Sequence, residues 1–214
     1  PPLAAIAREQ TAGRGQWGRT WQSPPGGLYL SLWLATDLPI SYCPHPVLWS
    51  AWGIAHALIQ HGIPVQVKWP NDLLLKGKKL AGIKTESKIN GNRITAAIIG
   101  VGLNWTNPVP ATGIALGPFC EAESIQSINS LTDLAEITLA GLTLGWHRYQ
   151  REGIAGILVD YLQLFAHRGR EISLPQGVGM VESVTAQGEL VVLIGQRREI
   201  ILPGTVSLGY DHAG

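Results

Sequence analysis

The sequence has 214 residues, of which 45% are apolar and 14% are charged, and its formal net charge is +1. This composition is typical of a folded protein with a sizeable core and argues against extensive disorder. A net charge near zero argues against a protein that binds nucleic acid through a dense basic surface. Cys43 and Cys120 stand far apart without a Cys-x-x-Cys pair, which argues against a disulfide scaffold or a zinc module and favours the reducing cytoplasm.

Other familiar signals are missing from the sequence. No apolar run approaches the roughly 18 residues that span a bilayer, and no signal peptide is visible, so no membrane partner is expected. The six histidines show no metal-ligand spacing such as His-Glu-x-x-His, so no metal-binding residues are predicted. The sequence contains no Gly-x-Ser-x-Gly motif, which argues against a serine hydrolase.

The first half of the chain predicts several strands around one helix. Apolar residues recur at helical spacing from 47 to 59, and Gly62 and Pro64 then stop the helix. Residues 73–75 and 80–86 are typical of a hairpin around Gly77, and Asn90-Gly91 predicts a tight turn into the next strand. Strands are predicted at 3–7, expected to be buried, and at 28–35, 65–69, 73–75, 80–86 and 94–103.

The second half predicts two helices followed by short strands. Ser130 and Asp133 resemble a capping box that begins a helix running to 149, and a second helix is predicted at 154–166. Short strands are then predicted at 171–174, 179–185, 190–194, 199–202 and 205–208. We therefore expect an α+β catalytic domain over 1–167, with a mixed sheet flanked by helices, and a small β-barrel over 168–214.

The glycine-rich loop (residues 13–21) is the most informative segment. Its glycines expose backbone N–H groups, and Arg14 and Arg19 add two fixed cations that can converge on one small anion. Trp17 and Trp21 are costly to expose and can cover an apolar or aromatic ligand. The alternative is an ordinary turn with solvated arginines. The loop lacks the Gly-Lys-Ser/Thr ending of the phosphate loop of nucleotide hydrolases.

Three later segments offer further candidates. Asp72, at the end of Lys68-Trp69-Pro70-Asn71-Asp72, can accept a proton, orient a nucleophile, hold a metal ion, or simply cap a turn. Lys79 leads into an apolar run, which sets it apart from the solvated lysines around it. Gly100-Val101-Gly102-Leu103-Asn104 either admits a ligand ring or ribose against the backbone or is a simple strand bend.

These four segments, in this order, resemble the catalytic domain of biotin protein ligases (biotin–[acetyl-CoA-carboxylase] ligases). The resemblance is specific at 13–21, 68–73, 79–83 and 100–104 and looser near the C-terminus. It implies a mixed sheet with helices followed by a small SH3-like domain. It also implies an AMP-forming reaction of biotin and ATP, with Mg²⁺, that gives biotinyl-5′-AMP, followed by transfer of biotin to a lysine of the biotin carboxyl carrier protein of acetyl-CoA carboxylase.

The resemblance also assigns roles by position. It places the catalytic groups at Lys79, Arg14, Lys68 and Asp72, with Lys79 on the biotin carboxyl and the acyl-phosphate oxygens. Gln10, Arg14 and Gly15 are implied to line the biotin pocket, and Gly82 and Asn104 to serve the adenylate. The full set of implied substrate-binding residues is Gln10, Arg14, Gly15, Gln16, Trp17, Trp21, Lys79, Gly82 and Asn104.

The sequence departs from the family pattern in two ways. The family has a Ser-Thr-Asn-like segment, which holds the biotin ring, upstream of the point where this sequence begins. Gln16 stands where many members have a third arginine, so we expect weaker retention of biotinyl-AMP. No helix-turn-helix pattern precedes the catalytic region, so neither a DNA-binding domain nor a nucleic-acid partner is expected.

Two other readings remain open. Lipoate or octanoate ligases and transferases share the general fold, although they lack the Gly-Arg-Gly loop. A ligand-binding protein without activity, or a catalytically impaired biotin-binding paralogue, is the other alternative. Biotin-dependent release of pyrophosphate separates an enzyme from a binder.

Overall fold

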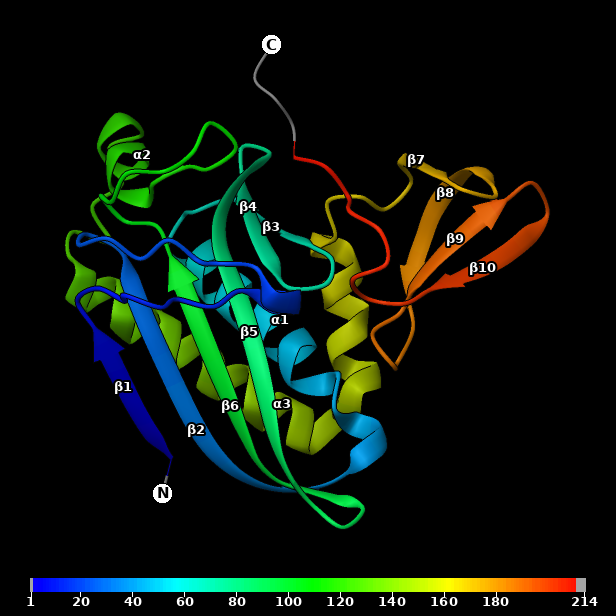
Figure 1. Cartoon of the computed structure of the whole chain (residues 1–214). Coiled ribbons are helices and arrows are strands. Elements are labelled where there is room, and N and C mark those ends of the chain that lie inside the picture. Colours follow the sequence, from blue (N-terminus) through cyan, green and yellow to red (C-terminus); the bar gives the residue numbers. More distant parts are fainter. Residues whose placement is uncertain (1, 211–214) are drawn as a thin grey trace.

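The computed structural model describes residues 2–210 and shows two β-sheets, the larger with helices packed on one face (Figure 1). The larger sheet has six strands in the order β1-β2-β6-β5-β4-β3. Every pairing between these strands is antiparallel. The expected α+β fold is confirmed.

The strands of this sheet largely follow the sequence expectation. β2 extends to a proline beyond the predicted end, and the Asn90-Gly91 turn joins β5 to β6 as predicted. The prediction of a buried first strand is wrong, because Leu3 and Ile6 are 68% and 55% exposed on an edge strand with one neighbour. The strands are β1 Leu3–Ala7, β2 Leu28–Pro39, β3 Val65–Lys68, β4 Asp72–Leu75, β5 Lys78–Asn90 and β6 Arg93–Leu103.

Two helices, α1 (His45–Gln60) and α3 (Leu131–Leu164), cover one face of the sheet. Glycines allow the two helices to come close: a Cβ at Gly53 would collide with the carbonyl of Gly141, and a Cβ at Gly145 with that of Trp49. Apolar side chains that alternate along the strands pack beneath the helices, and their opposite neighbours face the other way. The free face of the sheet is therefore available for a site.

The start and the bend of α3 agree with local signals in the sequence. The Ser130 hydroxyl accepts a hydrogen bond from the Asp133 N–H at 3.1 Å, which confirms the predicted cap. Gly153, at φ 66°, breaks the helix where the two predicted helices meet. The short α2 (Leu116–Ala122) and two 3-10 turns, Gln16–Gly18 and Ile40–Tyr42, were not predicted.

The smaller sheet has four strands in the order β10-β9-β8-β7, consistent with the expected SH3-like domain. Its strands are β7 Glu171–Leu174, β8 Gly177–Val184, β9 Leu190–Ile194 and β10 Arg197–Ile201. The fifth predicted strand, at 205–208, is wrong, because these residues form turns and irregular chain. The β8–β9 turn packs on the first domain, where the Trp69 indole donates a hydrogen bond to the Gly188 carbonyl at 2.7 Å.

No helix within residues 2–210 combines the length and the apolar character needed to cross a membrane.

Candidate active site

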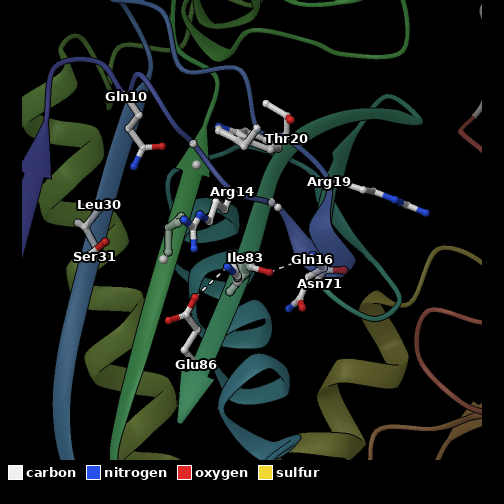
Figure 2. Close-up of a pocket in the computed structure, with 18 of the residues that line it drawn as sticks. Gln10, Arg14, Gln16, Arg19, Thr20, Leu30, Ser31, Asn71, Ile83 and Glu86 are labelled. Atoms are coloured by element: carbon white, nitrogen blue, oxygen red, sulfur yellow. Dashed lines mark hydrogen bonds and ion pairs between the residues drawn. The ribbon is translucent and has the colours of Figure 1, made fainter. Parts of the chain in front are cut away.

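A cavity of about 760 Å³ lies on the free face of the large sheet, under the glycine-rich loop. β2, β6, β5 and β4 supply its floor, and residues 9–21 supply its roof. Figure 2 shows side chains from both layers directed into the space between them. The cavity thus brings together segments that are far apart in the sequence.

The strand register explains how the floor of the cavity is built. Residues directly opposite each other on neighbouring strands point to the same face, so a row of them crosses the sheet. We call one such line the cross-strand row. It consists of Ala7, Tyr29, Gly102, Gly82, Asp72 and Lys68, in that order across all six strands. One row therefore carries two glycines at its centre and two charges at one end.

Two further rows complete the floor. Ser31, Gly100 and Lys84 lie opposite one another in the next row, and Ile98 and Glu86 lie opposite each other beyond it. The Lys84 ammonium pairs with the Glu86 carboxylate at 2.8 Å. Lys84, and to a smaller extent Arg14, holds the pKa of Glu86 below its ordinary value. This part of the cavity is polar and contains charges of both signs.

The glycine-rich loop is folded back on itself. The Gly15 N–H donates to the Arg19 carbonyl at 2.7 Å, and the Trp21 N–H donates to the Gly13 carbonyl at 3.0 Å. Gly13 has no room for a side chain, because a Cβ there would lie 2.7 Å from the hydroxyl oxygen of Ser23. Several N–H groups that were expected to face an anion are therefore used inside the loop.

The two arginines of this loop do not converge on one point in this structure. Figure 2 shows Arg14 turned inward over the strands, whereas Arg19 extends away from it. Each arginine affects a different titratable group. Arg14 contributes to the lowered pKa of Glu86, and Arg19 contributes to the lowered pKa of Lys68. The loop thus places one cation at each end of the cavity.

Trp21 packs on the two central glycines of the cross-strand row. A Cβ at Gly82 would lie 2.9 Å from its ring, and one at Gly102 would collide with the ring. The Lys79 ammonium lies 5.1 Å from the ring centroid, within the range of a cation–π contact. The glycines were expected to admit a ligand ring, but here they admit Trp21. Gly100 remains open, since a Cβ there would meet only the Lys84 carbonyl at 3.6 Å.

The charged end of the row is centred on Asp72, which is 6% exposed. Its Oδ1 lies 2.7 Å from the Lys79 ammonium, and its Oδ2 lies 3.7 Å from that of Lys68. Oδ2 also accepts a hydrogen bond from the Tyr210 hydroxyl at 2.6 Å. Burial lowers the pKa of Lys68 to about 8, although the Asp72 charge opposes that shift. Lys68 therefore loses its proton at a lower pH than an exposed lysine does.

Most of the predicted site residues lie around this cavity. Lys68 is covered by its neighbours and reaches the cavity only through Asp72. Asn104 does not line it, because its amide donates hydrogen bonds to the carbonyls of Lys79 and Ile114, both at 3.3 Å. The predicted residues that line the cavity are Gln10, Arg14, Gly15, Gln16, Trp17, Trp21, Asp72, Lys79 and Gly82.

Sequence reasoning missed several side chains near the site, including Ser31, Glu86 and Tyr210. Ser31 and Glu86 line the cavity from β2 and β5. The only sequence signal for them was that each lies at a position of its strand that points away from the core. Tyr210 contacts Asp72 from 138 residues away, and no local pattern indicated this contact.

No protein cage for a metal ion is present among residues 2–210, since no three His, Cys, Asp or Glu side chains gather there. His212, one of the histidines considered above, lies outside the described residues. Two carboxylates of the cavity, Asp72 and Glu86, are paired with lysines.

The sequence of this chain is similar to those of known ligases. Residues 1–104 match the model of the biotin/lipoate A/B protein ligase family. The chain is 29% identical to a biotin–[acetyl-CoA-carboxylase] ligase of Paracoccus denitrificans, over 95% of this chain and 89% of the relative. It is 41% identical to the bifunctional ligase/repressor BirA of Bacillus subtilis over 46% of this chain, which spans only 31% of that relative.

The fold has solved counterparts. A structure of biotin protein ligase from Aquifex aeolicus in complex with biotin and ATP superposes with a TM-score of 0.77 at 24% identity. The superposition covers 97% of this chain and 89% of the other. At this identity the likeness establishes the fold.

Proposed function

Residues 1–104 match the biotin/lipoate A/B protein ligase family, and on that premise we propose that the chain is a biotin protein ligase. It joins biotin to ATP to form biotinyl-5′-AMP and then transfers biotin to one lysine of a carrier protein. Near-full-length similarity to a biotin–[acetyl-CoA-carboxylase] ligase supports this choice within the family.

One structural observation carries the proposal: the Lys79 ammonium stands between Asp72 and the Trp21 ring, at the edge of the cavity. A cation in that place faces the cavity while its pairing with Asp72 fixes its direction. Its side chain is 26% exposed, so a ligand can reach it. This arrangement suits a reaction in which two anions must meet.

In the first step, a biotin carboxylate oxygen attacks the α-phosphorus of ATP. A P–O bond forms, the bond to the β-phosphate breaks, and pyrophosphate leaves. The approach brings together two negatively charged groups, so fixed cations lower the barrier more than they favour the separated substrates. Lys79 and Arg14 fill this role in the proposal, with Arg19 at the other end of the cavity.

In the second step, the amine of the carrier lysine attacks the acyl carbon, and the bond to AMP breaks. A lysine with a pKa of about 10.4 must lose a proton first, which costs about 4.6 kcal/mol at pH 7. Asp72 is the group we assign to receive or direct that proton. Because it already holds Lys79, the two steps share one ion pair.

Mg²⁺ enters the proposal only with the nucleotide. Within the described residues, Asp72 and Glu86 of the cavity are each paired with a lysine. Mg²⁺ is commonly held by substrate phosphates and water with few protein ligands. No catalytic role of this chain's residues is assigned through the ion.

We place the domain boundary between residues 167 and 168, just before the second sheet begins at Glu171. The catalytic domain then contains the whole cavity except for the contact from Tyr210. The partner in the second step is proposed to be the biotin carboxyl carrier protein of acetyl-CoA carboxylase.

The direct test measures product formation. Purified protein with ATP, Mg²⁺ and biotin is expected to release pyrophosphate and to yield biotinyl-AMP by mass spectrometry, and addition of a carrier domain is expected to consume it. Octanoate and lipoate serve as the competing substrates. Product with either of those acids and none with biotin would replace the proposal by the lipoate or octanoate alternative, and no product with any acid would refute the enzyme.

A further inference from the structure

Tyr210 connects the C-terminal segment (residues 202–210) to the charged end of the cavity. Its hydroxyl donates to Asp72 Oδ2 at 2.6 Å, and its ring lies 3.5 Å from the Lys68 ammonium, measured to the ring centroid. Both contacts are made by a side chain that comes after the last strand of the small sheet. One tyrosine therefore contacts two charges of the catalytic domain.

The three partners of Asp72 divide its two oxygens between them. Lys79 takes Oδ1, while Tyr210 takes Oδ2 with Lys68 further away. Rotation of the carboxylate about its Cβ–Cγ bond would break the contacts to both oxygens at once. The Tyr210 hydroxyl thus fixes the direction in which Oδ1 points, and with it the position of the Lys79 ammonium.

The segment that carries Tyr210 is itself held by the glycine-rich loop. Gly204 has a φ of +90°, and a Cβ there would lie 2.6 Å from the Trp17 indole nitrogen. Burial, together with the Asp72 charge, raises the pKa of Tyr210, so its hydroxyl stays protonated and remains a donor near neutral pH. The hydrogen bond is therefore available throughout the working range of an enzyme in neutral solution.

We propose that Tyr210 is a positioning residue that acts through Asp72 to hold the Lys79 ammonium where the acyl-phosphate forms. The inference rests on the proposed function, but it concerns a residue outside the catalytic domain that was not among the predicted site residues. Tyr210 does not line the cavity, so its effect reaches the reacting atoms through Asp72.

The variants separate the hydroxyl from the ring. Tyr210→Phe removes the donor and keeps the ring over Lys68, whereas Tyr210→Leu removes both. Tyr161→Phe is the matched control. Tyr161 is fully buried, and the charge of Asp72 acts on it, yet its hydroxyl has no hydrogen-bond partner within the described chain.

The kinetic test measures biotin-dependent pyrophosphate release. Tyr210→Phe is expected to lower kcat about tenfold while KM for biotin and ATP stays within about twofold, because a hydrogen bond to a charged group is lost without loss of a substrate contact. Tyr161→Phe is expected to match the unmodified protein. In a Lys79→Ala background, Tyr210→Phe is expected to cause no further loss, since the two residues act in one chain of contacts.

An unchanged kcat in Tyr210→Phe would overturn the inference, and so would an equal tenfold loss in the Lys79→Ala background. A purely structural role for the ring predicts that Tyr210→Leu alone is impaired. These results leave the proposed function intact as long as the unmodified protein makes biotinyl-AMP.

A second measurement does not depend on activity. Lysine labelling with acetic anhydride, read by mass spectrometry, reports how firmly each amine is held. Lys79 is expected to be labelled faster in Tyr210→Phe than in the unmodified protein or in Tyr161→Phe, while Lys68 becomes reactive only in Tyr210→Leu. Equal labelling of Lys79 in all variants overturns the inference, even if the protein makes no adenylate.

Discussion

The two halves of the cross-strand row differ in what builds them. At its centre, Gly82 and Gly102 have no side chains, and this lets the Trp21 ring lie against the sheet. At its end, Asp72 and Lys68 are buried charges that contact each other and Tyr210, and Asp72 also contacts Lys79. A Cβ added at Gly82 or Gly102 would displace the Trp21 ring. Removal of one charge at the other end would leave its partner buried without a counter-charge.

This contrast shows how a single sheet face provides shape and charge together. The spacing of opposite residues is fixed by the backbone, so the distance between the Trp21 plane and the charged cluster is fixed as well. A substrate that packs on the Trp21 ring is therefore held at a fixed distance from the charged groups around Asp72. The four predictions that follow perturb the cross-strand row or the groups beside it, from the largest expected effect to the smallest.

Lys79→Ala removes the cation that lies between the halves. Adenylate formation is expected to fall by about 10²–10³-fold, since removal of one preorganised group at a developing charge has effects of that size. ATP affinity should change far less. Single-turnover formation of biotinyl-AMP and a separate titration with ATP measure the two quantities, and an equal loss in both would contradict the assigned role.

Lys68→Met tests the charged end through the dependence of stability on pH. The folded-state pKa of Lys68 is lowered to about 8 from its ordinary value of 10.5, so between these values the unfolded chain binds more protons. The free energy of unfolding should therefore rise as the pH increases from 8 to 10.5, by at most about 3 kcal/mol at 1.36 kcal/mol per pKa unit.

Urea denaturation at several pH values measures this slope. In Lys68→Met the rise should be absent, because the titrating group is gone. A rise of the same size in Lys68→Met would assign it to another residue.

Gly102→Ala tests the uncharged half. The added Cβ collides with the Trp21 ring, and overpacking of this kind costs about 1–3 kcal/mol. Gly100→Ala is the matched control on the same strand, because its Cβ would meet nothing closer than 3.6 Å. The midpoint temperature of thermal unfolding should be lower in Gly102→Ala and nearly unchanged in Gly100→Ala. Equal effects in the two variants would rule out the Trp21 contact as the cause.

Gln16→Arg has the smallest expected effect. Gln16 lines the cavity from the glycine-rich loop, and an arginine there adds a cation facing the adenylate. Release of biotinyl-AMP should slow by about fivefold, which corresponds to roughly 1 kcal/mol. Gln16→Met has similar length without charge and should not slow release. Equal release from both variants and the unmodified protein would remove the idea.

Local sequence signals predicted most of the fold. Alternating apolar residues gave the strands, Ser130 marked the start of α3, and the Asn90-Gly91 turn gave the β5–β6 hairpin. The signals did not distinguish an edge strand from a central one, so the strand at 3–7 was wrongly expected to be buried. Burial on both sides depends on neighbours that local periodicity does not reveal.

The site was predictable where its residues lie on the floor of one sheet, and less so where other segments meet it. Asp72 was predicted because it follows Pro70-Asn71 at a strand end, and Lys79 because it leads into an apolar run, whereas Gly82 was implied only by the family resemblance. The separate directions of Arg14 and Arg19 depend on hydrogen bonds inside the loop. The contact from Tyr210 depends on the packing of the small sheet, which no short-range pattern encodes.

The hydrogen bond from Trp69 to Gly188 has a practical consequence for recombinant work. Trp69 precedes Asn71 and Asp72 on the same short stretch of chain, and its indole N–H is buried. A fragment that stops at residue 167 would lack both the Gly188 carbonyl that accepts this hydrogen bond and the Tyr210 side chain that contacts Asp72. We therefore expect a protein truncated at residue 167 to be poorly ordered around Asp72, where catalysis is proposed.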